Sequence, residues 1–299
     1  LLQKFFIMQL TLDSKFATYT PPKSQLLKWV GNKHRFASEI ARFFPTDFNS
    51  FYEPFLGSGA VMATVAPNIG IGSDAFLPLI QIWQKLKDDP NGLVEWYAEN
   101  RNKLDSCDKV EVYENVKASF NARHNGKDFL FLTRSCYGGI VRFRKSDGYM
   151  STPCGPHTPI SVNSFALRVK NWHGRMKNVD FVHADYKEVF ALAREGDLIY
   201  CDPPYSHSQG ILYGAQSFRL EDLFDEIVKA KSKGVRVALS IDGSKKSGNY
   251  LCDLPIPANV FEEEIFVSVG CSMLRRFQME GQTLEEELVS DRLLLNYSI

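Results

Sequence analysis

A carboxylate followed by two prolines and an aromatic ring is the segment of this chain best suited to chemistry. Asp202 comes directly after the apolar run 198–201 and precedes Pro203, Pro204 and Tyr205. The carboxylate only accepts hydrogen bonds, and proline carbonyls accept them without a competing N–H, so together they would select a substrate –NH2 that donates two protons. Tyr205 would stack on the ring that carries this amine. The segment favours a site for a flat amino group over a plain proline-terminated strand.

The second feature is a glycine-rich turn over residues 53–60 with an acid further along the chain. Gly57 and Gly59 let the backbone approach a ligand closely. The turn is not G-x-G-x-x-G and no Lys-Ser/Thr pair follows, so dinucleotide and triphosphate sites are disfavoured. Asp74 ends the next predicted strand, where an acid accepts hydrogen bonds from ribose hydroxyls in nucleoside-binding folds. The turn alone would more often be structural, but with this acid it favours a nucleoside ligand.

A third segment, residues 27–33, lies just before the first predicted helix. Lys33 is a cation able to meet an amino-acid carboxylate, and Trp29 offers a flat apolar surface. The alternative is a capped helix start with a surface lysine.

These residues can form one site only in a fold that brings the ends of several strands close together. Apolar patterns predict strands over 48–55, 69–74, 179–185, 197–201, 235–240, 264–269 and 292–297, and helices over 33–44, from about 61, within 83–127 and over 221–233. Strands that alternate with helices imply a mostly parallel, doubly wound α/β sheet, which binds ligands outside the carboxyl ends of its strands. Residues 128–178 change to Gly, Arg, Ser, Thr and Pro with interleaved aromatics, and we interpret them as an insertion.

Composition narrows the class of protein. The 299 residues are 44% hydrophobic and 23% charged, as in an ordinary globular protein of one or two domains. No apolar run approaches the roughly 20 residues of a membrane span, and the apolar start has neither a basic leader nor a cleavage site, so we expect a cytoplasmic protein. The six scattered cysteines favour reduced thiols, and no residues have metal-site spacing. Because 35 basic residues balance 35 acidic ones, any nucleic-acid site must be a local basic patch.

Together these segments resemble the Dam-like, alpha-order DNA adenine N6-methyltransferases. The pattern of that family runs L-K-W-x-G-x-K, E-P-F-x-G-x-G, an acid ending the second strand, an inserted target-recognition region and D-P-P-Y, and this chain has them all in order. The resemblance implies a Rossmann-like class I methyltransferase domain over 23–84 and 179–299. It also implies a largely helical target-recognition insertion with a β-hairpin over 85–178. The implied cofactor is S-adenosylmethionine, with the following binding residues: Trp29, Lys33, Glu53, Phe55, Gly57, Gly59, Asp74, Asp185 and Asp202.

The insertion resembles the DNA-binding segment of the family, N-x-x-x-x-G-x-x-R. Residues 131–149 cluster basic and aromatic side chains around a hairpin turn at 146–148, and the implied DNA-binding residues are Arg134, Tyr137, Arg142, Arg144 and Lys145. Thr133-Arg134 stands where many members have Asn-Lys, so target-site details are not transferred. Asp185-Tyr186 matches the acid-aromatic motif beside the adenine pocket, although an Asp after a strand is commonly a helix cap.

The resemblance implies site-specific transfer of a methyl group to N6 of an adenine flipped out of duplex DNA. Asp202 and the Pro203 carbonyl would each accept one N–H of the amine. Alternatives are an RNA-adenine or protein-glutamine amino-methyltransferase, which a D-P-P-Y site would also suit, and a non-catalytic DNA-binding protein on the same scaffold. The recognised bases, a restriction endonuclease partner and the oligomeric state stay open.

Overall fold

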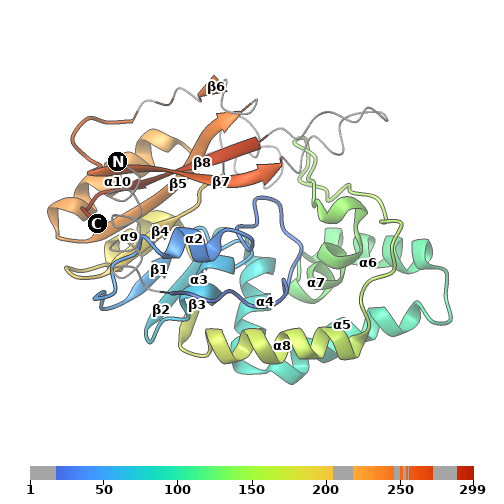
Figure 1. Cartoon of the computed structure of the whole chain (residues 1–299). Coiled ribbons are helices and arrows are strands. Elements are labelled where there is room, and N and C mark those ends of the chain that lie inside the picture. Colours follow the sequence, from blue (N-terminus) through green and yellow to red (C-terminus); the bar gives the residue numbers. More distant parts are fainter. Residues whose placement is uncertain (1–17, 205–217, 246–249, 252–253, 255, 272–287) are drawn as a thin grey trace, which may run out of the picture.

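A mostly parallel sheet runs through the centre of the computed structural model, which describes residues 18–204, 218–245, 250–251, 254, 256–271 and 288–299 (Figure 1). Its strand order is β3-β2-β1-β4-β5-β8-β7, with β6 beside β5. The strands are β1 (Phe51–Glu53), β2 (Gly70–Asp74), β3 (Val179–His183), β4 (Leu198–Cys201), β5 (Arg236–Lys245), β6 (Tyr250–Leu251), β7 (Glu263–Cys271) and β8 (Leu288–Leu295). Neighbours from β3 to β5 are parallel, and β8 runs antiparallel to β5 and β7. The predicted α/β class is confirmed.

Alternation along the strands gives the sheet two buried faces. In β4, Leu198 and Tyr200 join a core with helices α2 (Ala37–Ala41), α3 (Ala60–Val65) and α4 (Leu77–Asp88). Ile199 and Cys201 point to the other face and pack with α9 (Tyr186–Leu192) and α10 (Leu220–Ser232). Successive side chains of a strand point to opposite faces, so an unbroken apolar strand must be covered on both sides. This is the doubly wound arrangement.

The order in which the chain adds strands to the sheet reverses between β1 and β4. β1 pairs with β2 on one side and with β4 on the other, and all three strands run the same way. Their carboxyl ends therefore share one edge at the point where the strand order reverses, which is where open α/β sheets bind ligands. Glu53, Asp74 and Asp202 reach this edge from three separate parts of the sequence.

Four helices between β2 and β3 extend to one side of the sheet (Figure 1). They are α5 (Pro90–Lys103), α6 (Lys109–Arg123), α7 (Gly126–Ser135) and α8 (Val162–Met176), and α8 lies along α5 and α4. Tyr97 of α5 packs on Phe165 of α8 with ring centroids 4.2 Å apart. Their apolar side chains join the same core as those of α4, so these helices are packed onto the sheet without a break.

Two helices differ from the prediction. Composition identifies 128–178 only as an insertion and gives no bounds for a helix there, but the stretch contains α8, whose buried face repeats at helical spacing through Phe165, Val169, Trp172 and Met176. Polar residues and a glycine separate these apolar positions, so the overall composition of the stretch does not indicate a helix. The helix expected over 33–44 shortens to α2, because a turn in which Phe36 N donates to Lys33 O precedes it.

The predicted hairpin turn is present in the insertion. Phe143 and Met150 form an antiparallel bridge, and Arg144 N donates to Tyr149 O at 2.9 Å. Gly148 closes the turn with a φ of +68°.

None of the helices in the described ranges is long and apolar enough to cross a membrane.

Candidate active site

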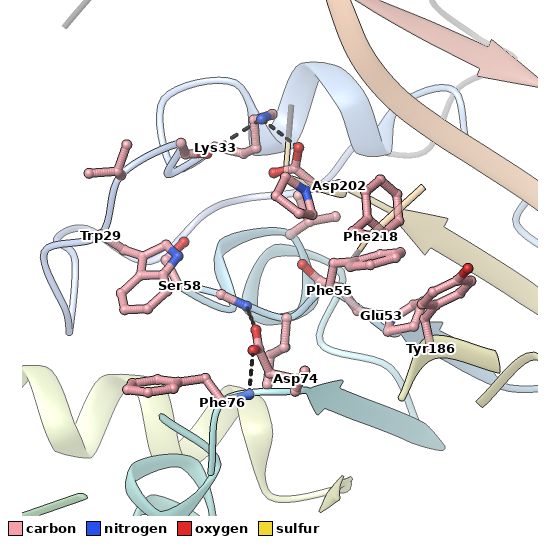
Figure 2. A pocket seen from close by; sticks show the side chains of 18 of the residues that line it. Trp29, Lys33, Glu53, Phe55, Ser58, Asp74, Phe76, Tyr186, Asp202 and Phe218 are labelled. Carbon is pink, nitrogen blue, oxygen red and sulfur yellow. Dashed lines mark hydrogen bonds and ion pairs between the residues drawn. The ribbon is translucent and has the colours of Figure 1, made fainter. Parts of the chain in front are cut away.

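A cavity of about 320 Å³ opens outside the carboxyl ends of β1, β2 and β4. Its wall includes most of the residues predicted to bind a cofactor or substrate, although they come from distant segments (Figure 2). These residues are Trp29, Lys33, Glu53, Phe55, Gly57, Asp74, Asp185, Asp202 and Pro204. Gly59 and the buried Pro203 are not part of the wall. Tyr205 lies outside the described residues.

The glycine turn is fastened to the end of β2 by Asp74. Gly57 N donates to Asp74 Oδ2 at 3.0 Å, and Phe76 N donates to Asp74 Oδ1 at 3.0 Å (Figure 2). Burial raises the pKa of Asp74, and these backbone donors act in the opposite direction. Each carboxylate oxygen has a second lone pair. Asp74 therefore orders the turn and still presents acceptor capacity at the cavity.

The two glycines of the turn have different surroundings. Gly57 has a φ of +48°, and a Cβ there would lie 3.1 Å from Trp29 Nε1, on the cavity wall. Gly59 has a φ of +61° and begins α3, where a Cβ would lie 2.8 Å from Met176 Cε. Gly59 thus permits close packing of α3 against α8, and it does not line the cavity.

Glu53 is a buried carboxyl at the end of β1. It accepts a hydrogen bond from Met62 N at 2.8 Å, and so holds the first turn of α3 in place. Burial raises the pKa of Glu53 well above its usual value, and the charge of Asp202 acts in the same direction. Glu53 therefore retains its proton to higher pH than an exposed glutamate.

Lys33 lies between two carboxylates. Lys33 Nζ is 2.7 Å from Asp202 Oδ1 and 3.4 Å from Asp291 Oδ2. Burial lowers the pKa of Lys33, but the two carboxylates outweigh it and the pKa lies above its usual value. Sequence reasoning had assigned Lys33 to a cofactor carboxylate and had not found Asp291. The structure gives the ammonium two partners within the chain, and its contact with a cofactor stays a prediction.

Aromatic rings form one end of the cavity. Phe55 stacks on Tyr186 at 5.2 Å between ring centroids, and Phe218 stands edge-on to Phe55 at 5.6 Å. Asp185 lines the same region and caps α9, because it accepts from Lys187 N at 2.9 Å. Both predicted roles of Asp185, as a helix cap and as a residue of the pocket, are compatible with this position. Phe218 has no sequence signal of its own.

A second aromatic group stands at the opposite side of the cavity. Phe76 and Phe143 contact each other edge-on at 5.5 Å, and both line the cavity with Trp29. Phe143 belongs to the predicted DNA-binding hairpin. Sequence reasoning had placed it among the aromatics of that segment but had not connected it with the cofactor site.

The basic hairpin is exposed beside this end of the cavity. Arg142, Arg144, Lys145 and Tyr137 all lie on the surface. Arg144 pairs with Asp147 through two hydrogen bonds of 3.1 and 2.8 Å, and its guanidinium lies over the ring of Tyr149.

Arg134 is a correction to the predicted DNA surface. Its side chain is buried at 7% exposure, donates to Leu26 O at 2.6 Å and lies over the Phe165 ring. Burial lowers the pKa of Arg134 to about 10. The guanidinium ties α7 to the segment before Trp29, so it has a structural role and does not face solvent.

Comparison with known proteins identifies the family of this chain. Residues 29–265 match the family described as D12 class N6 adenine-specific DNA methyltransferase. The chain belongs to this family. The methyltransferase is 28% identical over 234 residues to a DNA adenine methylase of Vibrio cholerae. The aligned residues cover 72% of this chain and 79% of the relative. The expected enzyme class, an adenine-specific DNA methyltransferase, is confirmed.

Further relatives carry related names. A type II methyltransferase of Lactococcus lactis subsp. cremoris is 25% identical over 233 residues, or 73% of this chain and 80% of the relative. A DNA N-6-adenine-methyltransferase of Escherichia phage P1 is 26% identical over 235 residues, or 73% of this chain but 30% of the relative. The family match ends before β8, so it does not include Asp291 of the methyltransferase.

Proposed function

We propose that this methyltransferase transfers the methyl group of S-adenosylmethionine to N6 of an adenine rotated out of duplex DNA. The observation that carries the proposal is the single cavity that joins Asp202, the glycine turn and Asp74. A nucleoside site and an amine-accepting carboxylate on one wall are what this reaction requires.

The residues of the cavity fit S-adenosylmethionine. The volume of about 320 Å³ lies within the usual range for small-ligand sites. Asp74 would accept from ribose hydroxyls, and the stacked pair Phe55 and Tyr186 offers apolar surface to a purine ring. When bound, the cofactor supplies a methyl group on a positively charged sulfur. The acidic side chains of the wall, among them Asp202 and Asp185, suit a cation.

Asp202 would orient the amine of the substrate. The lone pair of an exocyclic adenine nitrogen is delocalised into the ring, so the site must turn this nitrogen towards a tetrahedral geometry. An ordinary aspartate is ionised at neutral pH and only accepts hydrogen bonds. Asp202 and the adjacent Pro203 carbonyl would each take one N–H, with Lys33 fixing the carboxylate through Oδ1.

The exposed hairpin would bind the duplex. Arg142 and Lys145 are exposed and would meet phosphates or guanine edges, and the exposed ring of Tyr137 would occupy the space of an extruded base. Rotating a base out of the duplex costs a few kcal/mol, which stacking contacts of about 1–3 kcal/mol per base offset. We retain 85–178 as the proposed target-recognition region.

One experiment tests both the substrate and the methyl transfer of this proposal. Radiolabelled methyl uptake from S-adenosylmethionine is measured for duplex DNA, RNA and protein, and the labelled DNA is sequenced to find the modified adenines. We expect label only on adenine in duplex DNA. Asp202→Ala should abolish uptake while duplex affinity is largely kept, because phosphate contacts lie elsewhere. Label on RNA or protein, or near-normal turnover of the variant, would contradict it.

The names of the relatives also bear on biological role. One is a DNA adenine methylase and another a type II methyltransferase. A restriction endonuclease that cuts the same sequence is a hypothesis for this chain, and digestion of unmethylated DNA by the products of adjacent genes would test it.

A further inference from the structure

Asp291 is a buried carboxylate that contacts Lys33 of the cavity wall and has no part in the motifs of the sequence. It lies in β8, where its Cα pairs with that of Asp242 near the carboxyl end of β5. Because β8 is antiparallel, its first half lies at the sheet edge where the parallel strands end. Asp291 is 7% exposed. A buried carboxylate is costly unless a cation pairs with it, and here Lys33 does so.

The two carboxylates share one lysine. Lys33 Nζ contacts Asp202 Oδ1 at 2.7 Å and Asp291 Oδ2 at 3.4 Å, and Lys33 itself is 6% exposed. Asp291 places a second carboxylate beside the lysine, so Lys33 divides its charge between two partners. The lysine can therefore hold Asp202 in place while Asp291 offsets part of the lysine charge.

We propose that Asp291 is a positioning residue for methyl transfer: it holds Lys33 against Asp202 and compensates the lysine charge. The inference rests on the proposed function. In that reaction the N6 lone pair forms the new bond to the methyl carbon, the electron pair of the broken carbon–sulfur bond stays on sulfur, and N6 afterwards gives one proton to solvent. Positive charge moves from sulfur to N6, which would face Asp202. Because Asp291 offsets part of the lysine charge, less positive charge from Lys33 opposes the positive charge that develops on N6, and the transition state is stabilised.

The test separates charge from stability. Asp291→Asn keeps the size of the side chain and one acceptor oxygen but removes the charge. We expect the single-turnover rate constant on duplex DNA to fall by roughly 10- to 100-fold. This is the loss found when an outer group that orients a metal-binding side chain is removed, and Asp291 would orient Lys33 in a comparable way. The dissociation constants of S-adenosylmethionine and DNA should change by less than about threefold, since a transition-state effect lowers the rate without weakening binding.

Asp197→Asn is the matched control. Asp197 is equally buried at 4% exposure and accepts from Ser50 N and Arg194 N, but it precedes β4 at the opposite end of the strand. This variant should lose stability and keep the rate constant. Single turnover with saturating enzyme in excess over DNA gives a rate constant that does not depend on the folded fraction, and urea denaturation measures the stability of each variant separately.

The outcomes are distinguishable. A normal rate constant for Asp291→Asn, or an equal loss in Asp197→Asn, would overturn the role of Asp291. If Asp291→Asn does not fold, Asp291→Glu takes its place: it keeps the charge, so a rate within about threefold of wild type supports the proposal and a larger loss refutes it. A wild-type enzyme that does not methylate DNA would instead contradict the proposed function.

Discussion

Substitution of Gly57 by alanine tests the link between the glycine turn and the cofactor. The φ of +48° is a left-handed conformation, which costs a residue with a Cβ about 1–2 kcal/mol. The new Cβ would also lie 3.1 Å from Trp29 Nε1 and 3.3 Å from Trp29 Cδ1, so the indole must move by a few tenths of an ångström. Because Trp29 lines the cavity, we expect weaker cofactor binding by about tenfold, or 1.4 kcal/mol, in addition to the loss of stability.

Two other glycines supply the controls for this experiment. Gly174→Ala adds a Cβ on α8 with nothing within 4 Å, so it should stabilise the protein by about 0.5–1 kcal/mol. Gly59→Ala has the same backbone strain as Gly57→Ala but faces Met176 and lies outside the cavity wall, so it should mainly lower stability.

Urea denaturation and isothermal titration with S-adenosylmethionine measure the two effects separately. Wild-type affinity and an undiminished unfolding free energy for Gly57→Ala would refute the reasoning.

Two further predictions concern the arginines of the insertion and the buried glutamate. Arg142→Ala should weaken duplex binding and reduce the slope of log affinity against log salt by about one. Arg134→Ala should leave that slope unchanged but lower the unfolding free energy by about 1.5–3 kcal/mol, because Leu26 O loses its charged donor; equal slopes for the two variants would contradict the assignment. Burial raises the pKa of Glu53, so its contribution to stability is complete below the unfolded pKa of about 4.3 and is lost as pH rises through the folded pKa. Glu53→Gln should flatten this part of the pH dependence in urea titrations, and an unchanged curve would count against a raised pKa.

The arrangement of the candidate site could be predicted where each residue directly follows a strand. Asp74 and Asp202 end parallel strands, so the strand pattern alone brings them to one edge. Asp291 has no such signal. Its position depends on the antiparallel pairing of β8 with β5, which joins segments that the periodicity of the sequence does not connect.

The sequence predicted which segments carry the basic side chains but not which of these side chains are exposed to solvent. Arg134 lies in a cluster of basic residues, yet α7 turns it towards Leu26 and away from solvent. A sequence shows that arginines are close together but not which helix face meets the core. Trp172 of α8 illustrates the same point, since its donation to Ser24 O depends on a contact with a distant segment.

The hairpin of the insertion has two faces with different constraints. Phe143 lines the cavity and packs on Phe76, whose backbone N–H binds Asp74, whereas its neighbours Arg142 and Arg144 are exposed. Exchange of the outward residues would leave the wall of the cavity intact, while exchange of Phe143 would disturb it. On the proposed function, Arg142 and Arg144 can therefore change to suit another target without altering the cavity.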